Sequence, residues 1–363
     1  MSPEMPLKPG AVIGILGGGQ LGRMLALAAA RLGLRCHIYA PKGDNPAFEV
    51  AHQATEAAYE DGEALAAFAR SVAVATYEFE NVPVEAAKAV AALTPLAPGA
   101  NVLEVSQDRL LEKSFVRDRG IGVPDFLAVS STEELDAALQ RIGRPAILKS
   151  RRLGYDGKGQ AMIAAGDDPR QAFQSIGGVP AILEAFVPFL AEISVIAARS
   201  RDGSFAAYDV PQNHHRGGIL RRSVVPAPID GRTVEAASAM AMRLMAELDY
   251  VGVMATEMFL VDEQGGERLL VNEIAPRVHN SGHWTIDACS ISQFEQHIRA
   301  IAGWPLGDPV RHSDAVMENL IGEEIDRWPA LLAESRLALH LYGKSATRPG
   351  RKMGHFTRLM PGD

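Results

Sequence analysis

Two glutamates in the C-terminal half have the spacing of a metal-binding pair. Apolar runs at 254–261 and 269–275 flank Gly265 and Gly266, which predicts an antiparallel hairpin. A hairpin centred at Gly265 places Glu257 opposite Glu273, about 5 Å apart. Two carboxylates this close repel each other unless they share a proton or bind a cation. Because Mg²⁺ prefers carboxylate oxygens together with phosphate and water, the pair is a candidate magnesium site.

The predicted register has further consequences and leaves alternatives open. It pairs Phe259 with Val271 and Val261 with Leu269. A slip of one residue would turn one glutamate into solvent, because side chains alternate along a strand. Two facing carboxylates also suit general acid and base chemistry, as in glycoside hydrolysis. A phosphate-binding loop elsewhere in the chain favours the metal.

That loop is the glycine-rich segment 154–160. It holds three glycines and Lys158 between two predicted strands, so it offers amides and a cation to a phosphate and can close as a lid. It lacks both the G-x-x-x-x-G-K-[ST] pattern and the following helix of a Walker loop. The alternative is a solvated hairpin tip. Lys149 favours the lid, because a lysine inside the apolar strand 145–151 must extend to solvent or meet an anion.

Polar and basic side chains gather at two further places. Arg277, His279 and Asn280 follow Glu273 closely and could grip a small oxyanion beside the metal, although a merely solvated loop is the alternative. A basic cluster near the C-terminus suits the phosphate of a small anionic substrate, although a short basic run is often a solvated edge. The cluster comprises Lys344, Arg348, Arg351 and Lys352.

The first glycine cluster, near the N-terminus, is a less specific indication of function. Gly17, Gly19 and Gly22 satisfy G-x-G-x-x-G between a predicted strand and a predicted helix. A nicotinamide enzyme would carry an acid about 20 positions later to hold the ribose, and here the second strand ends at Pro41 without one. The glycines offer close approach and free amides at a helix N-terminus, which suits a substrate phosphate or ribose. A tight turn without a ligand is the alternative.

Strands and helices of several kinds must position these residues. A strand at 11–16, a helix at 21–32, a strand at 36–39, a strand at 72–79 and a helix at 84–93 favour a parallel sheet covered by helices. The following elements are a helix at 101–119, a capped helix from Ser131 or Thr132, strands at 145–151, 160–164 and 181–187, strands within 193–228, helices at 234–248 and 291–302, and short strands near 316, 337–341 and 354–359.

These elements predict a fold of the α/β and α+β classes in three domains. The first is a Rossmann-like substrate-binding domain over 1–108, and the second is a lid domain over 109–190. The third covers 191–363, carries the metal site and ends in a small β-rich subdomain.

Composition narrows the class of protein. The chain has 363 residues, 47% of them hydrophobic, which is ample for several cores. The net charge is −8 and the basic residues are scattered, which argues against a nucleic-acid partner. Cys36 and Cys289 have no partner at metal or redox spacing, and no apolar run is long enough to span a membrane. We therefore expect a cytoplasmic protein without nucleic-acid or membrane partners.

Taken together, the motifs resemble those of the ATP-grasp superfamily and, within it, of the N5-carboxyaminoimidazole ribonucleotide synthetases of purine biosynthesis. The resemblance runs from about Val12 to Leu359. Its most specific segments are GGGQLGRM (17–24), TYEFENVP (76–83), QDRLLEK (107–113), GYDGKGQ (154–160), NEIAPRVHNSGHWT (272–285) and RPGRKMGH (348–355).

The resemblance implies an ATP-grasp fold and ATP-driven carboxylation of 5-aminoimidazole ribonucleotide, with Mg²⁺ as cofactor and bicarbonate attacking the γ-phosphate to form carboxyphosphate. ATP would lie against Arg109, Lys149, Gly154, Tyr155, Asp156, Gly157, Lys158, Gly159, Gln160, Glu184, Ala185, Phe186, Val187, Glu192, His215, Asn272 and Glu273. The ribonucleotide would contact Gln20, Leu21, Glu80, Tyr155, Asp156, Lys344 and Arg351. Arg277, His279 and Asn280 would bind bicarbonate, Lys149 would neutralise the transferring phosphoryl group, and Glu257 with Glu273 would hold the metal.

Several points stay open at this level. Sequence does not decide between His214 and His215 at the nucleotide, or between Glu78 and Glu80 at the substrate. Another ATP-grasp ligase, such as formate-dependent glycinamide ribonucleotide transformylase or a biotin carboxylase subunit, is an alternative, but these chains tend to be longer and fit the RPGRKMGH segment less well. A non-catalytic nucleotide sensor would not need the carboxylate pair. We expect a homodimer, for which apolar helices such as 21–32 leave room.

Overall fold

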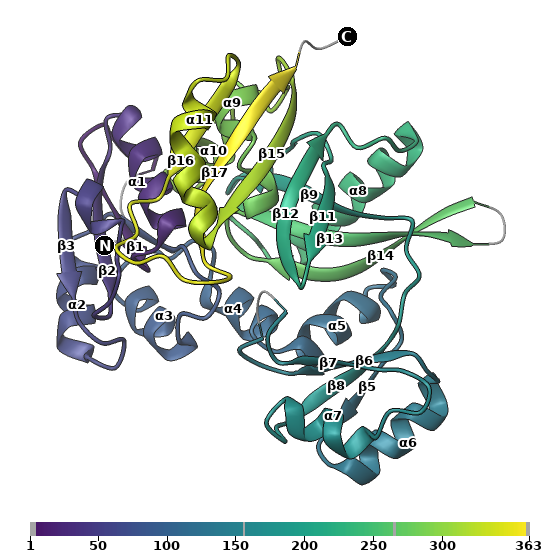
Figure 1. The fold of residues 1–363 in the computed structure, drawn as a ribbon. Helices are drawn as coiled ribbons and strands as arrows, with labels where there is room; N and C mark the ends of the chain where they lie inside the picture. The colour runs from purple at the N-terminus through teal and green to yellow at the C-terminus, as the bar shows by residue number, and fades with distance from the viewer. Residues whose placement is uncertain (1–4, 155–156, 264–265, 361–363) are drawn as a thin grey trace.

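The computed structural model describes residues 5–154, 157–263 and 266–360 (Figure 1). Tyr155 and Asp156, which the resemblance assigns to ATP and substrate, lie outside the described residues. Within the described ranges, every helix is too short or too polar to cross a membrane.

The N-terminal part is a parallel sheet with the strand order β3-β2-β1-β4, as the alternation of strands and helices predicts. Its elements are β1 (Val12–Leu16), α1 (Gln20–Arg31), β2 (Arg35–Ala40), β3 (Gln53–Glu56), α2 (Gly62–Arg70), β4 (Val74–Tyr77) and α3 (Val84–Ala91). β1 and β4 are almost wholly buried, which explains their continuous apolar sequence. β3 and α2 were not predicted; β3 is an exposed edge strand whose polar sequence QATE gives no apolar signal.

The predicted helix at 101–119 is wrong, because the chain forms two helices there. α4 (Ala100–Ser106) ends before Asp108, and α5 (Arg109–Asp118) begins after it. The Asp108 carboxylate accepts hydrogen bonds from the amides of Leu110 and Leu111, and it binds Arg151 at 2.7 Å. An aspartate that satisfies helix N-terminal amides starts a new helix instead of continuing the old one.

The central part is an antiparallel sheet with the order β5-β8-β6-β7. It comprises β5 (Phe126–Val129), α6 (Thr132–Ile142), β6 (Ala146–Ser150), β7 (Gln160–Ile163), α7 (Pro169–Ser175) and β8 (Ala181–Ala185). The predicted cap of α6 is confirmed, since the Ser131 hydroxyl accepts the Glu134 amide at 3.2 Å. α7 was not predicted.

The C-terminal part is one large antiparallel sheet with the order β14-β13-β9-β11-β12-β15-β17-β16, with β10 paired to β9. Its strands are β9 (Ala191–Arg199), β10 (Phe205–Ala207), β11 (Gln212–Arg216), β12 (Ile219–Val225), β13 (Gly252–Glu263), β14 (Gly266–Ala275), β15 (Asp314–Ile321), β16 (Leu337–Leu341) and β17 (Lys352–Met360). Its helices are α8 (Gly231–Glu247), α9 (Thr285–Ala288), α10 (Gln293–Ile301) and α11 (Trp328–Leu332). Short 3₁₀ turns lie at Phe48–Val50, Asn280–Gly282 and Gly322–Arg327.

The three sheets fall within the three predicted domain ranges, although the boundaries themselves stay a prediction. α5 lies between the central sheet and the large sheet and contacts β8 of the first and β14 of the second, and the N-terminal domain lies beside β16 and β17 (Figure 1). α1 packs against α10, and Asp44 pairs with Arg351 at 2.7 Å, so the two ends of the chain are joined. This arrangement brings residues from all three parts to one cavity.

Candidate active site

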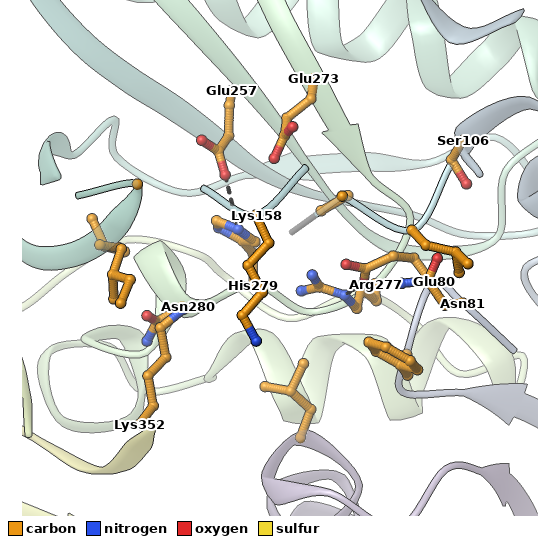
Figure 2. Close-up of a pocket in the computed structure, with 18 of the residues that line it drawn as sticks. Glu80, Asn81, Ser106, Lys158, Glu257, Glu273, Arg277, His279, Asn280 and Lys352 are labelled. Carbon is orange, nitrogen blue, oxygen red and sulfur yellow. Dashed lines mark hydrogen bonds and ion pairs between the residues drawn. The ribbon is translucent and has the colours of Figure 1, made fainter. Parts of the chain in front are cut away.

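A cavity of about 580 Å³ collects most of the side chains that the sequence analysis singles out. The predicted site residues that line it are Gln20, Leu21, Glu80, Arg109, Gly154, Lys158, His215, Glu257, Glu273, Arg277, His279, Asn280, Lys344 and Arg351. Figure 2 shows the two glutamates on neighbouring strands beside His279, with Arg277 and Glu80 together at one side. Sequence segments more than 300 residues apart thus share one cavity.

The predicted carboxylate pair is present, since β13 and β14 place Glu257 opposite Glu273. The other two predicted pairings are wrong: Met258 faces Val271, Phe259 faces Leu270, and Val261 faces Arg268. The reason is a β-bulge, which the register places between Glu257 and Met258 on one strand and at Asn272 on the other.

The bulge at Asn272 decides which residue faces Glu257. Continued without interruption from the pair Glu263 and Gly266, the register would place Asn272 opposite Glu257. The extra residue moves Glu273 into that position instead. The Asn272 Oδ1 atom is buried and has no hydrogen-bond partner in the described part of the chain. Asn272 itself does not line the cavity, whereas Glu257 and Glu273 both do.

Basic side chains surround the carboxylate pair. His279 Nε2 lies 2.9 Å from Glu257, and an Arg109 guanidinium nitrogen lies 3.0 Å from Glu273. Burial alone would raise the pKa of Glu257, but the charges of His279, His215 and Lys352 hold it well below its usual range. Glu112 is the opposite case, because burial and then the charge of Glu273 raise its pKa. Across the described residues, no cluster of three or more His, Cys, Asp or Glu has metal-binding geometry.

His215 and not His214 faces the cavity. A register shift in β11 falls between the two residues, His214 is exposed, and His215 lines the cavity. The His215 Nδ1 atom lies 2.9 Å from Glu192, the residue that the resemblance assigns to the nucleotide. Burial would lower the pKa of His215, but the hydrogen bond to Glu192 and the charge of Glu257 raise it above its usual value.

The predicted nucleotide residues outside the cavity lining fall into two groups among the described residues. Glu192 and Asn272 lie on the large sheet, in β9 and β14. The others lie in or next to strands of the central sheet and are Lys149, Gly157, Gly159, Gln160, Glu184, Ala185, Phe186 and Val187. Lys149 is buried and donates to Glu184 at 2.8 Å, which supplies the anion that its apolar strand demands. Lys113, 1% exposed, lies 3.5 Å from the other oxygen of Glu184. Burial would raise the pKa of Glu184, but the two lysines lower it to about 2.

The side chains of the predicted anion loop already have protein partners. Arg277 forms an ion pair with Glu80, which lies between the N-terminal domain and the loop. Asn280 and Asn319 exchange two amide hydrogen bonds, at 2.9 and 2.7 Å. Burial would raise the pKa of Glu80, but Arg277 lowers it. A small anion would therefore meet a loop whose donors are held in place.

The first glycine loop does not offer the free amides that the sequence analysis expects. The Glu78 carboxylate accepts the amides of Gly19 and Gly22, at 2.9 and 3.0 Å. A side-chain atom at Gly17 or Gly19 would come within 3 Å of Glu78. The glycines therefore admit an internal carboxylate, and that expectation is wrong for these two amides. Gln20 and Leu21 still line the cavity.

The basic C-terminal segment closes the same side of the cavity. The Lys344 ammonium donates to the Lys352 carbonyl at 2.7 Å, and Arg351 pairs with Asp44 of the N-terminal domain. Burial and then the charge of Arg351 lower the pKa of Lys344 to about 8. The cluster is thus buried in part and not a solvated edge.

Sequence reasoning missed several residues that support the site. They are Glu112, Lys113, Asn319, Gln293 and Asp44. Glu112 and Val116 occupy the buried face of α5, so a charge at an apolar position of the helix was an available signal. Asn319 lies in a strand far along the chain, where sequence offers no signal.

Comparisons with known proteins agree with the resemblance. Residues 11–107 match the ribonucleotide synthetase preATP-grasp domain, residues 114–294 the ATP-grasp domain, and residues 315–361 the phosphoribosylaminoimidazole carboxylase C-terminal domain. The N5-carboxyaminoimidazole ribonucleotide synthase of Brucella melitensis is 54% identical over 357 residues, which cover 98% of each chain.

Solved structures give the same answer for the fold. The N5-carboxyaminoimidazole synthetase of Staphylococcus aureus, complexed with ADP, has a TM-score of 0.93 at 35% identity and covers 100% of this chain and 96% of its own. The Aspergillus clavatus synthase, in complex with ADP and 5-aminoimidazole ribonucleotide, has a TM-score of 0.91 at 28% identity and covers 97% and 94%.

Proposed function

The chain belongs to the N5-carboxyaminoimidazole ribonucleotide synthase family of ATP-grasp enzymes, and we propose that it carboxylates 5-aminoimidazole ribonucleotide with ATP and bicarbonate. In the proposed sequence, bicarbonate attacks the γ-phosphate of ATP to give carboxyphosphate and ADP. Carboxyphosphate then releases CO₂ and phosphate, and the substrate amine captures the CO₂ and loses a proton.

The observation that carries this proposal is the pairing of two kinds of site in one cavity. Glu257 and Glu273 face each other on adjacent strands, as a Mg²⁺-phosphate site requires. His279 contacts Glu257, which brings the anion loop of Arg277, His279 and Asn280 beside the carboxylates. Bicarbonate on that loop would lie next to a γ-phosphate on the metal, which is the geometry that the first step needs.

The carboxylate pair fits Mg²⁺ on chemical grounds. Mg²⁺ in nucleotide sites takes one or two carboxylates and completes its shell with phosphate oxygens and water. Glu257 and Glu273 offer hard carboxylate oxygens from two facing strand positions, and both line the cavity. A bound Mg²⁺ would neutralise charge on the phosphates. Arg109, which is paired with Glu273 at 3.0 Å, would then be available to the phosphates.

Lys149 would serve the nucleotide by exchanging partners. It is paired with Glu184, and a phosphate group would compete for its ammonium. Lys113 lies 3.5 Å from Glu184 and would keep that buried carboxylate neutralised after the exchange. Glu192 and His215 would hold the nucleotide from the large sheet, and the loop 154–160 would cover it and keep water from carboxyphosphate.

The other end of the cavity would hold the ribonucleotide. Gln20, Leu21 and Glu80 line it from the N-terminal domain, and Lys344 and Arg351 line it from the C-terminal segment. The two cations suit its 5′-phosphate.

Phosphate release by the purified protein tests the proposal. Release from ATP should require bicarbonate and should rise when 5-aminoimidazole ribonucleotide is added. Stimulation by formate with glycinamide ribonucleotide would instead assign the other ligase activity. A protein that binds ATP without releasing phosphate with any amine would be a nucleotide sensor, and the proposal would be wrong.

We also propose a homodimer located in the cytoplasm. The proposed contact surface is α1, on which Leu27 is 50% exposed. Light scattering of the purified protein checks the dimer, and Leu27→Glu should shift it toward the monomer.

A further inference from the structure

His279 occupies a point where two hydrogen-bond systems meet. Its Nε2 atom lies 2.9 Å from Glu257, and its Nδ1 atom lies 2.8 Å from the Ser281 hydroxyl. The Ser281 hydroxyl lies in turn 2.7 Å from Ser194 on β9. Both contacts require one position of the His279 ring, and that position in turn requires that the His279 backbone is held in place.

Gln293, the first residue of α10, holds that backbone at two points. Its Oε1 atom accepts the His279 amide at 2.9 Å, and its Nε2 atom donates to the His279 carbonyl at 2.7 Å. Because a backbone amide only donates and a carbonyl only accepts, this contact fixes the orientation of the Gln293 carboxamide. Gln293 is fully buried and does not line the cavity, so it acts through His279 and not on a ligand.

Further contacts fix Gln293 itself. Its Nε2 atom is 3.1 Å from His283 Nδ1, and its own amide donates to the Thr285 hydroxyl at 3.0 Å. A Cβ atom at Gly282 would come within 2.8 Å of its side chain, so the loop packs directly on the carboxamide. A displaced Gln293 would therefore displace the loop 279–283.

We propose that Gln293 is a positioning residue that sets the affinity of the anion loop for bicarbonate by holding the backbone of His279. The inference rests on the proposed function, because it concerns the same anion loop. It predicts that loss of the carboxamide weakens bicarbonate use selectively and leaves the nucleotide and ribonucleotide ends of the cavity unchanged.

The same helix offers a matched control. Gln296, also fully buried, holds the backbone of Gly307 in the same way: its Nε2 atom donates to the Gly307 carbonyl at 2.8 Å, and its Oε1 atom accepts the Gly307 amide at 2.7 Å. Gln293→Met and Gln296→Met each remove a two-point contact from α10 with little change of volume. Only the first contact reaches the anion loop.

The experiment compares steady-state kinetics of the two variants with those of the wild type. Wild-type phosphate release that depends on bicarbonate and the ribonucleotide is measured first, and its absence would refute the proposed function and not this inference alone. Gln293→Met should raise the KM for bicarbonate about tenfold, with the KM values for ATP and the ribonucleotide within about twofold. Gln296→Met should leave all three unchanged. Equal effects of the two variants, or an unchanged bicarbonate KM in Gln293→Met, would overturn the positioning role.

A second variant keeps the test decisive if Gln293→Met does not fold. Gln293→Glu retains the acceptor for the His279 amide, and its protonated form also donates to the carbonyl. Because burial raises the pKa of a carboxyl group, the ratio of its bicarbonate KM to the wild-type value should fall toward one as pH is lowered from 8 to 6. A ratio that does not change with pH would contradict the inference.

Discussion

The two glycine-rich loops of the chain have similar compositions and different surroundings. The first, around Gly17 to Gly22, is packed on the buried carboxylate of Glu78, which takes two of its amides. The second, 154–160, contributes Gly154 and Lys158 to the edge of the cavity, and Gly157 and Gly159 have φ angles of +77° and +68°. Both loops combine close packing with a positive φ, since Gly17 has a φ of +112° and a Cβ atom at Gly159 would lie 2.5 Å from the Ser150 hydroxyl. The loops differ in that the Glu78 carboxylate fills the first.

The role of a glycine motif therefore depends on the group that packs against it. A carboxylate from within the chain makes the first loop part of the fold, so substitutions near it should alter stability. The second loop contacts Arg109 and lines the same cavity as Glu257 and Glu273, at the proposed nucleotide end, so substitutions there should alter turnover. Four predictions test this division, beginning with the largest effect.

Removing one carboxylate at the nucleotide end should abolish turnover. Glu273→Gln removes a charged ligand from the proposed Mg²⁺ site, and kcat should fall by about 1,000-fold, the scale on which charge stabilisation of a transition state acts. Magnesium titrations of phosphate release measure the effect. Glu263→Gln, at the exposed end of β13, is the control and should retain activity. Retained activity in Glu273→Gln would exclude the metal assignment.

A side chain in the second glycine loop should reduce turnover more than stability. In Gly159→Ala the new Cβ atom would lie 2.5 Å from the Ser150 hydroxyl at a φ of +68°. The displaced loop should lower kcat/KM for ATP about 100-fold, as small misplacements in a site do. Gly166→Ala is a matched control, because Gly166 has a φ of +90° but no atom within 4 Å. Equal kinetics in the two variants would show that the loop does not cover the nucleotide.

A substitution at the first loop should reduce stability more than turnover. Glu78→Ala leaves the amides of Gly19 and Gly22 without their acceptor, so the free energy of unfolding should fall by about 1–3 kcal/mol. The KM for ATP should stay within about twofold, because the proposed nucleotide residues lie at the other end of the cavity. Urea denaturation and ATP kinetics of one preparation measure both. Unchanged stability together with a raised KM for ATP would reverse the comparison.

The smallest expected effect is a pH dependence at the substrate end. Because burial lowers the pKa of Lys344 to about 8, its positive charge is present below that pH and lost above it. The KM for the ribonucleotide should therefore rise about tenfold between pH 7 and pH 9, if the charged lysine binds its phosphate. Lys344→Arg keeps its charge over this range and should flatten the profile. A profile shared by both proteins would assign the titration to another group.

Local sequence patterns were sufficient for most of the elements. The apolar runs of β1 and β4, the cap of α6 at Ser131 and the hairpin of β13 and β14 follow from contacts between residues near in sequence. The polar edge strand β3 and the break between α4 and α5 at Asp108 were missed. β3 is polar and therefore lacks the apolar pattern of a buried strand. The Asp108 cap divides a segment whose periodicity predicts one helix.

Local sequence was enough to predict that two glutamates lie in one hairpin, that a lysine in an apolar strand needs an anion, and that a polar loop follows the second glutamate. The remaining features depend on tertiary contacts. The bulge at Asn272 brought Glu273 opposite Glu257, Glu184 became the partner of Lys149, and Glu78 filled the first glycine loop from 56 or more residues away. These outcomes depend on packing and charge between distant segments, whereas the elements themselves depend on periodicity within a few residues.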